Sequence, residues 1–497
     1  MELKKLFKST SQLGVARIVQ VVLGIFKAKL EALLIGTTGV GIVTQVNFTS
    51  RQLSQFTLLG MNDGLTKQIA ESKQKENFRE IFCSAQKSYF LLSGLVTIIS
   101  LTFILFFSKK LTIYFFGDEE YLKYFLIAVS IFPILLLNSY SYAILKAFKS
   151  IKYIARAEIV SIIVSFIVFI PLIFLFKIYG AVFSIVIMFL AKLIFNHYNA
   201  KKYILNNFNI TYKDIFKSKV DTIQVKELLL FGSFGLSLGL YQIIIEVAGR
   251  GILINQLGID QLGLYSPGMN WGGKFQAIVL PALYTYLYPR FSELKNDNKS
   301  LTAIINDAWR MVGIFAIFLL FGGISLRYLV VPLFYSKEFT DAAIYIPGHF
   351  FGIFLFMLVE ALGQVFTPTG RIKIYGFMQF FRITFRLLVL YYLIPLFGLG
   401  GYMLRFIIPP LIFVVVYYLY LHKTIGLKIS KDNLLLFTFI IIGSVALYFL
   451  SEYNSWFAVF AAIIITSSVY FILKKTEKKQ IVKKIHTIKS KIFFKRK

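Results

Sequence analysis

The chain alternates between apolar runs, each about twenty residues long, and short stretches rich in charge, glycine or proline. A helix of about twenty apolar residues crosses the hydrocarbon core of a bilayer, so each run predicts a membrane-spanning helix. The least hydrophobic runs are the first, second and seventh. We predict about fourteen spans: 11–35, 40–61, 83–107, 121–146, 153–176, 178–198, 226–250, 262–288, 301–326, 343–367, 373–395, 398–421, 433–451 and 455–473.

A glycine cluster, Gly36, Gly39 and Gly41, separates the first two spans, and a Lys/Glu-rich exit follows the second. Glycine adopts positive φ at little cost, so the cluster predicts a tight turn. The pattern returns at a constant offset of about 220 residues, which indicates an internal repeat. The matching pairs are Gly36/Gly258, Gly41/Gly263, Glu71/Glu293 and Lys73/Lys295 (258 − 36 = 295 − 73).

Both copies of the repeat begin near a basic segment, so we interpret them as parallel repeats about an axis along the membrane normal. The predicted fold is an all-α polytopic membrane protein, in which two six-helix bundles are followed by a C-terminal helix pair. The predicted boundaries are 1–199 for the first bundle, 200–225 for a cytoplasmic linker, 226–422 for the second bundle, 423–473 for the extra pair and 474–497 for a basic cytoplasmic tail.

Composition agrees with this class of protein: 57% of residues are hydrophobic, 16% are charged and mean hydropathy is +0.71. The net charge of +30 does not indicate nucleic-acid binding, because the basic residues flank apolar spans and no basic soluble domain is present. The positive-inside rule then predicts that both termini are cytoplasmic. With that orientation the outer segments hold only Lys109, Lys110, Lys177, Arg250, Arg327 and Lys337.

The residues that catalysis or cofactors would need are not arranged in recognisable motifs. One cysteine, Cys83, excludes an intrachain disulfide and a multi-cysteine metal site. The four histidines are scattered, and no Walker-type phosphate loop occurs. No cleavable signal peptide follows the basic N-terminus. We therefore predict a protein that is not an enzyme, with no metal, no cofactor and no catalytic residue.

Ionisable residues within spans are costly and by default mark a polar cavity or pathway. Structural alternatives exist for several of them. Lys27–Glu31, Glu246–Arg250 and Asp307–Arg310 have the spacing of pairs on one helical face. Arg250, Lys192 and Arg405 lie close enough to span ends to snorkel. Further span residues are Glu158 and His349.

Cations outnumber acids among these residues, which favours a lumen that binds an anion such as a pyrophosphate. We predict a cationic substrate cavity formed by Arg17, Lys29, Arg51, Lys274, Arg310, Arg382 and Arg386. Three acidic residues are candidates for coupling to a cation: Glu246, Asp307 and Glu360. In the eighth span, Pro267, Gly268, the pair Gly272–Gly273 and Pro281 predict a broken or bent helix.

Three groups of motifs carry a resemblance to a known family. The first two spans read Gly36-x-x-Gly39-x-Gly41, then Asn47-Phe48, then Gly64-x-Thr66-Lys67-x-x-Ala70. The second half has Tyr286-Leu-Tyr-Pro-Arg-Phe-Ser-Glu-Leu294, and Lys337-Glu338-Phe339 precedes the tenth span. These motifs resemble the Wzx-type flippases of O-antigen and enterobacterial common antigen. That type belongs to the multidrug/oligosaccharidyl-lipid/polysaccharide (MOP) exporter superfamily.

The resemblance implies a V-shaped pair of bundles in the bacterial inner membrane that moves undecaprenyl-pyrophosphate-linked oligosaccharide to the periplasmic leaflet by alternating access. It implies a cavity role for Lys29, at the place of a first-helix lysine in the family; the other cavity residues are inferred from charge. Implied partners are this substrate, membrane lipids, a polysaccharide polymerase with its chain-length machinery and a coupling cation.

Alternatives to this function remain at the level of sequence. Many polysaccharide flippases stop at twelve spans, and the extra pair is similar to lipid II flippases of peptidoglycan synthesis. A cation-coupled drug or metabolite antiporter of the MATE type predicts that acids dominate the cavity. A membrane glycan polymerase or ligase predicts a large periplasmic loop, whereas the longest loop here, 199–225, faces inside.

Overall fold

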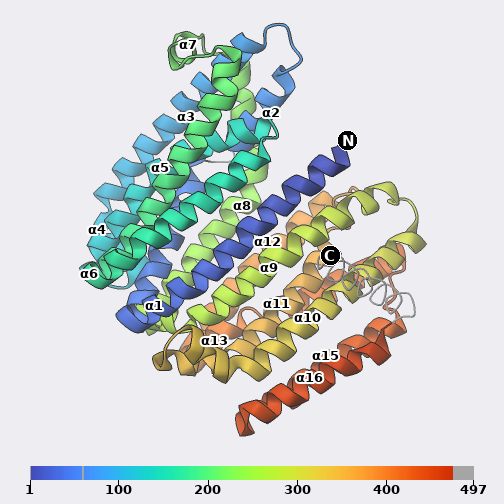
Figure 1. Cartoon of the computed structure of the whole chain (residues 1–497). Helices are drawn as coiled ribbons and strands as arrows, with labels where there is room; N and C mark the ends of the chain where they lie inside the picture. The colour runs from blue at the N-terminus through green and yellow to red at the C-terminus, as the bar shows by residue number, and fades with distance from the viewer. Residues whose placement is uncertain (1, 59–60, 474–497) are drawn as a thin grey trace, which may run out of the picture. The chain divides into compact units, whose positions relative to one another are not determined.

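The computed structural model describes residues 2–58 and 61–473, with side chains described throughout except at 2–18, 56–58, 229–238 and 471–472. Within these ranges the chain forms helices joined by short turns (Figure 1). The basic tail at 474–497 lies outside the described residues. The first helices are α1 (Glu2–Leu58), α2 (Met61–Ser72), α3 (Phe78–Phe106), α4 (Ser108–Phe116), η1 (Glu119–Tyr121), α5 (Leu122–Ala147), α6 (Ile151–Ala200), η2 (Lys201–Leu205), η3 (Asn206–Phe208) and α7 (Tyr212–Lys217). They are followed by α8 (Thr222–Leu257), α9 (Ile259–Glu293), α10 (Asn298–Phe334), η4 (Lys337–Ile344), α11 (Ile346–Gly363), α12 (Ile372–Phe397), α13 (Leu399–Leu404), α14 (Ile408–Ile425), α15 (Lys431–Tyr453) and α16 (Ser455–Ile472).

The all-helical, multi-pass class predicted from the sequence is confirmed. In the described part of the chain, eight helical stretches are long and apolar enough to cross a membrane, and α16 adds a shorter apolar helix. The fourteen predicted spans map onto thirteen of the described helices, because α1 and α6 each contain two spans and the span 398–421 covers both α13 and α14. Non-helical backbone divides α1 at Gly36 and α6 at Lys177, the two places where the predicted spans meet.

The internal repeat is visible in the backbone. Gly36 has φ 63° and ψ −168°, and its counterpart Gly258 has φ 98° and ψ 160°. Residues other than glycine rarely adopt this backbone conformation. A Cβ on Gly41 would clash with the carbonyl oxygen of Ile259, and a Cβ on Gly263 would clash with the carbonyl oxygen of Thr37. Thr37 and Ile259 are themselves one repeat apart. The two copies therefore cross through matched glycines, each of which lets the other copy's backbone approach.

Helix α9 continues through Pro267 and Pro281, so the helix is not broken there, and a bend at these residues stays a prediction. A Cβ at Gly272 would meet the side chains of Ile353 and His349 on α11. This glycine therefore permits close packing of α9 on α11 and does not interrupt the helix. Neighbouring helices can satisfy the backbone groups that proline leaves open, which explains how the helix survives.

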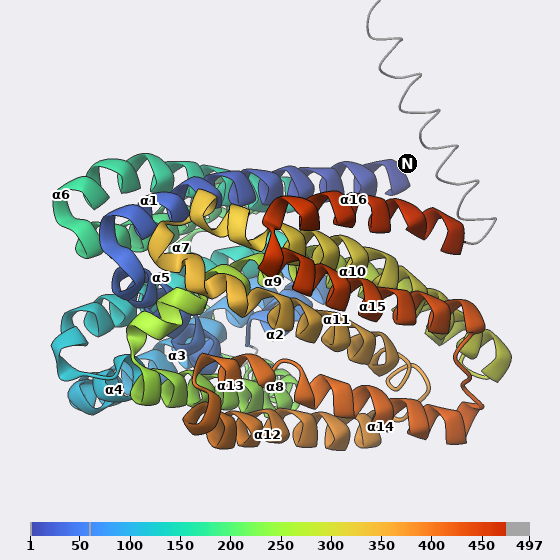
Figure 2. The ribbon, with the colours of Figure 1, turned by 90° about the horizontal axis from the view of Figure 1, so that it is seen from below.

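The chain divides into two compact units. Within the described residues, unit 1 comprises the chain up to 266 with 333–339 and 379–402, and unit 2 comprises 267–332, 340–378 and the chain from 403 onward. In unit 1, α1, α5 and α6 pack on one another, and α2 lies against α3, α5 and α8. In unit 2, α11 packs on α14, and α15 lies beside α16 as an antiparallel pair (Figure 2).

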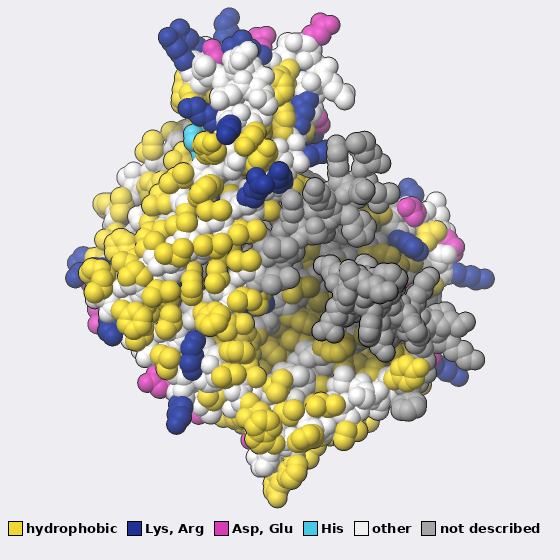
Figure 3. Space-filling view, in the orientation of Figure 1, with side chains coloured by type: hydrophobic (Ala, Val, Ile, Leu, Met, Phe, Trp, Pro, Cys, Tyr) yellow, Lys and Arg dark blue, Asp and Glu magenta, His cyan; other side chains and the backbone are white. Residues whose placement is uncertain are grey.

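The surface of unit 1 agrees with residence in a bilayer. Hydrophobic side chains cover the flank over α5 and α6, and Lys and Arg side chains gather at the end that carries α7 (Figure 3). Exposed side chains on α6 include Ile167 at 62% and Leu175 at 72% exposure. Large apolar surfaces of this extent mark a membrane or partner contact.

The predicted linker contains ordered structure. Helix α7 begins with a capping box in which Thr211 and Asp214 exchange hydrogen bonds. These bonds hold the pKa of Asp214 below its usual value, so the carboxylate stays ionised and accepts from Arg79 on α3 at 3.2 Å. Lys87 Nζ donates to the Ser218 carbonyl at 2.6 Å, and Phe216 stacks on Phe90. The segment before α8 is thus attached to one end of α3.

Candidate functional site: a cation-rich interior

The first charged cluster of unit 1 joins α1 to both halves of α6. Lys27 Nζ lies 3.8 Å from the Glu31 carboxylate and donates to Ser184 Oγ at 2.9 Å. The same ammonium lies 4.9 Å from the centre of the Phe169 ring. Glu31 is 8% exposed. The i,i+4 pair expected from the sequence is confirmed, and it also ties three helical segments together.

A second cluster lies further along the same helices. Arg51 Nε donates to Asn47 Oδ1 at 2.9 Å, and its guanidinium lies 5.6 Å from the Phe189 ring centre on α6. On α6 itself, Lys192 and Glu158 form an ion pair at 2.5 Å across the hairpin. Glu158 thus lies beside Lys192 and is also close enough to interact electrostatically with Arg51.

The third cluster connects α8 with the second half of α12. Arg386 Nη2 lies 2.7 Å from Glu246 Oε1, and the Tyr241 hydroxyl hydrogen-bonds to Thr384. Arg382 donates to Gln379 through Nε at 2.9 Å and Nη2 at 2.6 Å. The two arginines that share one face of α12 thus each have a defined partner, and Glu246 is engaged by another helix.

Arg250, which the spacing placed in a pair with Glu246, reaches α1. Its Nη1 donates to Gln45 Oε1 at 3.3 Å, and its guanidinium lies 3.9 Å from the centre of the Phe48 ring. Gln45 in turn donates from Nε2 to the Phe115 carbonyl at 2.8 Å. Arg250 therefore belongs to a polar connection between α8, α1 and α4.

Ten of the charged span residues selected in the sequence analysis lie in unit 1 with described side chains, and together they have an excess of positive charge. Three carboxylates each lie beside a cation, and the formal charge of the set is +4 (7 − 3). The cations are Lys27, Lys29, Arg51, Lys192, Arg250, Arg382 and Arg386, and the acids are Glu31, Glu158 and Glu246. Such a set can hold a multivalent anion such as a pyrophosphate, because guanidinium and ammonium donors suit phosphate oxygens. Arg17, also predicted for the cavity, lies in the part of α1 whose side chains are outside the described residues.

The other predicted site residues lie in unit 2 and are spread over several helices. Lys274 is half-buried on α9, and Asp307 is exposed on α10. Arg310 is 3% exposed and donates from Nη1 to the Asp432 carbonyl at 3.3 Å, where α15 begins. Glu360, 7% exposed on α11, accepts from the Tyr284 hydroxyl of α9 at 2.8 Å. These roles in cavity binding and ion coupling remain predictions.

The sequence reading did not find an ion pair that attaches the C-terminal helices. Arg327 on α10 is fully buried and donates to Glu452 on α15 at 2.5 Å, and the Tyr328 hydroxyl donates to the same carboxylate at 3.0 Å. The Arg327 guanidinium also lies 4.6 Å from the Tyr448 ring centre. A partner 125 residues away leaves no local signal in the sequence. In the described part of the chain, no group of three His, Cys, Asp or Glu could hold a metal ion.

This pair predicts a large stability effect. Glu452→Ala should lower the free energy of unfolding by about 3 kcal/mol, because it leaves a buried charge without its carboxylate. Arg327→Met should be milder, since an apolar side chain of similar length removes the buried charge itself. Thermal melting of the purified protein measures both effects, and Tyr453→Ala, at a neighbouring 83% exposed position, is the control. Equal melting of Glu452→Ala and the control would contradict this role.

The apolar helices define a multi-pass helical membrane protein. Residues 6–295, more than half of the chain, match the family described as polysaccharide biosynthesis protein, and the chain belongs to that family. No curated protein matches it in sequence.

Three solved structures show the same fold. The lipid II flippase MurJ in an inward closed conformation is similar at TM-score 0.64 and 19% identity, over 92% of this chain and 98% of that one. An inward-facing multidrug resistance MATE transporter is similar at TM-score 0.63 and 15% identity, over 84% of this chain and 98% of that one. A MOP superfamily transporter from Pyrococcus furiosus, described as having a binding pocket of reverse polarity, is similar at TM-score 0.57 and 14% identity, over 84% of this chain and 96% of that one. The chain therefore has the MOP flippase fold, as its resemblance predicted.

Proposed function

We propose that the protein moves undecaprenyl-pyrophosphate-linked oligosaccharide from the cytoplasmic to the outer leaflet of the bacterial inner membrane by alternating access. The observation that supports this proposal most directly is the +4 charge of the unit 1 set, because a pyrophosphate is the anionic part of such a substrate. Outward movement of a dianion is favoured by a negative-inside potential, by about 2.3 kcal/mol per charge per 100 mV.

Two observations bear on the alternatives. The similarity to a lipid II flippase over nearly the whole chain supports a pyrophosphate lipid of the peptidoglycan type as the second candidate. A MATE-type antiporter of cationic drugs is less compatible with the unit 1 set, in which each of the three acids already lies beside a cation. Glu360, hydrogen-bonded to Tyr284, is the best placed of the predicted coupling residues in unit 2, because it is buried. A polymerase with chain-length machinery is the partner that would consume the product.

The function is tested by measuring which leaflet holds the lipid-linked oligosaccharide in cells with and without the gene. We expect the glycolipid to accumulate on the cytoplasmic side in its absence and to return to the outer side on re-expression. The sugars of the accumulated lipid distinguish an oligosaccharide repeat from a peptidoglycan precursor. An unchanged lipid distribution together with altered drug tolerance would replace this proposal with the antiporter.

The proposed orientation, with both termini cytoplasmic, has its own test. In a Cys83→Ser background, Lys110→Cys should react with a membrane-impermeant maleimide in intact spheroplasts, because the segment of α4 lies outside. Lys213→Cys, equally exposed on α7, should react only after permeabilisation. Labelling of Lys213→Cys in sealed spheroplasts would reverse the orientation.

A further inference from the structure

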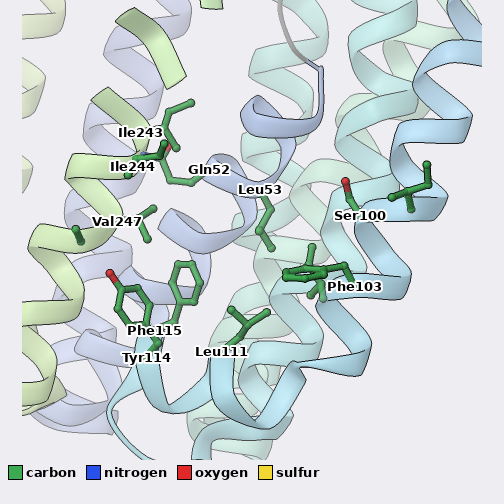
Figure 4. A pocket seen from close by; sticks show the side chains of 13 residues that line it. Gln52, Leu53, Ser100, Phe103, Leu111, Tyr114, Phe115, Ile243, Ile244 and Val247 are labelled. Atoms are coloured by element: carbon green, nitrogen blue, oxygen red, sulfur yellow. The ribbon is translucent and has the colours of Figure 1, made fainter. Parts of the chain in front are cut away.

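A pocket of about 500 Å³ lies in unit 1 among α1, α3, α4 and α8 (Figure 4). Its walls are formed almost entirely by apolar side chains. Ile99, Phe103 and Ile244 are 60%, 58% and 53% exposed, so the pocket opens on the outer flank of the unit. Other lining residues are Gln52, Tyr114, Phe115 and Val247.

Polar side chains lie behind the part of the pocket wall that Tyr114 and Phe115 form. Lining residues Tyr114 and Phe115 both have backbone carbonyls that accept side-chain hydrogen bonds, from Asn255 at 3.1 Å and from Gln45 at 2.8 Å. Gln45 Oε1 accepts from Arg250. Arg250 does not line the pocket itself, but it lies on α8 one helical turn beyond the lining residue Val247, so an anionic headgroup bound at its guanidinium would be next to the apolar chamber.

The position of Arg250 along α8 suits a headgroup. Arg250 precedes the end of α8 at Leu257 by seven residues, or about 10 Å at 1.5 Å per residue. Val247 and Ile244, three and six residues earlier, carry the pocket wall deeper along the same helix. A bound phosphate at Arg250 thus leaves its chain running along the pocket and away from the helix end.

We propose that this pocket binds the polyprenyl chain of the translocated lipid, with its pyrophosphate at Arg250, as a product site in the outer leaflet. The inference rests on the proposed function. Arg51 and Glu246 belong to the charged set of unit 1. Each directly precedes a residue that lines the pocket, Gln52 on α1 and Val247 on α8. A lipid whose headgroup leaves the charged set meets this pocket next.

Binding is tested without transport, by photo-crosslinking in nanodiscs with radiolabelled undecaprenyl pyrophosphate. A photoreactive benzoylphenylalanine is placed at Phe103 in the pocket or at Phe106, an 81% exposed position on the same helix, as the control. We expect an adduct at Phe103 several-fold stronger than at Phe106. Val247→Trp, which fills the pocket, and Arg250→Gln should each abolish the difference, whereas Arg250→Lys should retain most of it.

Three results would overturn the product site. These are equal adducts at the two positions, an adduct that Val247→Trp leaves unchanged, and displacement of the probe by an equal concentration of phosphatidylglycerol, which would assign the pocket to bulk phospholipid. Folding of each variant is checked by its melting temperature. If the adduct at Phe103 is lost while lipid transport between the leaflets is normal, the product site is ruled out and the proposed function stands. If the adduct is retained but lipid is not transported, the proposed function is ruled out and the binding site stands.

Discussion

Gly41→Leu and Gly263→Leu should each abolish the folded protein in the membrane. A Cβ on either glycine falls well inside van der Waals contact with a backbone carbonyl oxygen, of Ile259 or of Thr37. Added methylenes usually cost about 1–3 kcal/mol because side chains can shift, but a backbone atom cannot rotate away. Even Gly41→Ala and Gly263→Ala should have melting temperatures well below that of the wild type. Size-exclusion chromatography of samples heated to a series of temperatures measures this.

The same helix supplies a matched control. Gly273 on α9 has no atom within 4 Å of a Cβ placed on it, and Gly94 on α3 has none either. Alanine is favoured over glycine inside a helix by about 1 kcal/mol, so Gly273→Ala and Gly94→Ala should melt at or above the wild-type temperature. A wild-type melting temperature for Gly263→Leu would contradict the crossing of the two repeats.

Features that depend on neighbouring residues were predictable from the sequence. The turn at Gly36 and its copy at Gly258 follow from the conformational freedom of glycine, and the span boundary at Lys177 follows from a single charge between apolar runs. The Lys27–Glu31 pair follows from the helical period. Each of these features depends on residues within a few positions of it in the sequence.

Features that depend on tertiary neighbours were not predictable. The helical period places Arg250 one turn from Glu246 on α8. The Glu246 carboxylate nevertheless pairs with Arg386 on α12, and no sequence pattern predicts a contact between these two helices. Pro267 and Pro281 predict interruption of an isolated helix, whereas packing on α11 keeps α9 continuous. Arg310 was selected for its charge within a span, and its contact with the start of α15 adds a structural role that only the fold reveals.

Arg51→Ala combined with Lys29→Ala should reduce transport of the lipid-linked oligosaccharide strongly. The double change lowers the unit 1 charge from +4 to +2 (4 − 2). A hydrogen bond to a charged group contributes about 1.5–3 kcal/mol, so each lost contact to a pyrophosphate should weaken binding by about tenfold or more. The leaflet assay measures the loss, and surface expression and melting temperature establish that the protein is otherwise intact.

Two further variants separate the effect of charge on transport from the effect of side-chain shape. Arg51→Lys with Lys29→Arg keeps the charge at +4 and should retain much of the transport. Glu158→Gln raises the charge to +5 and releases Lys192 from its ion pair, so transport should persist even though a half-buried pair is lost. If the charge-conserving pair failed like the alanine pair, specific geometry would govern the site. If the alanine pair transported normally, the cation-rich interior would not be the binding site, and the ion pairs of α1, α6, α8 and α12 would serve packing alone.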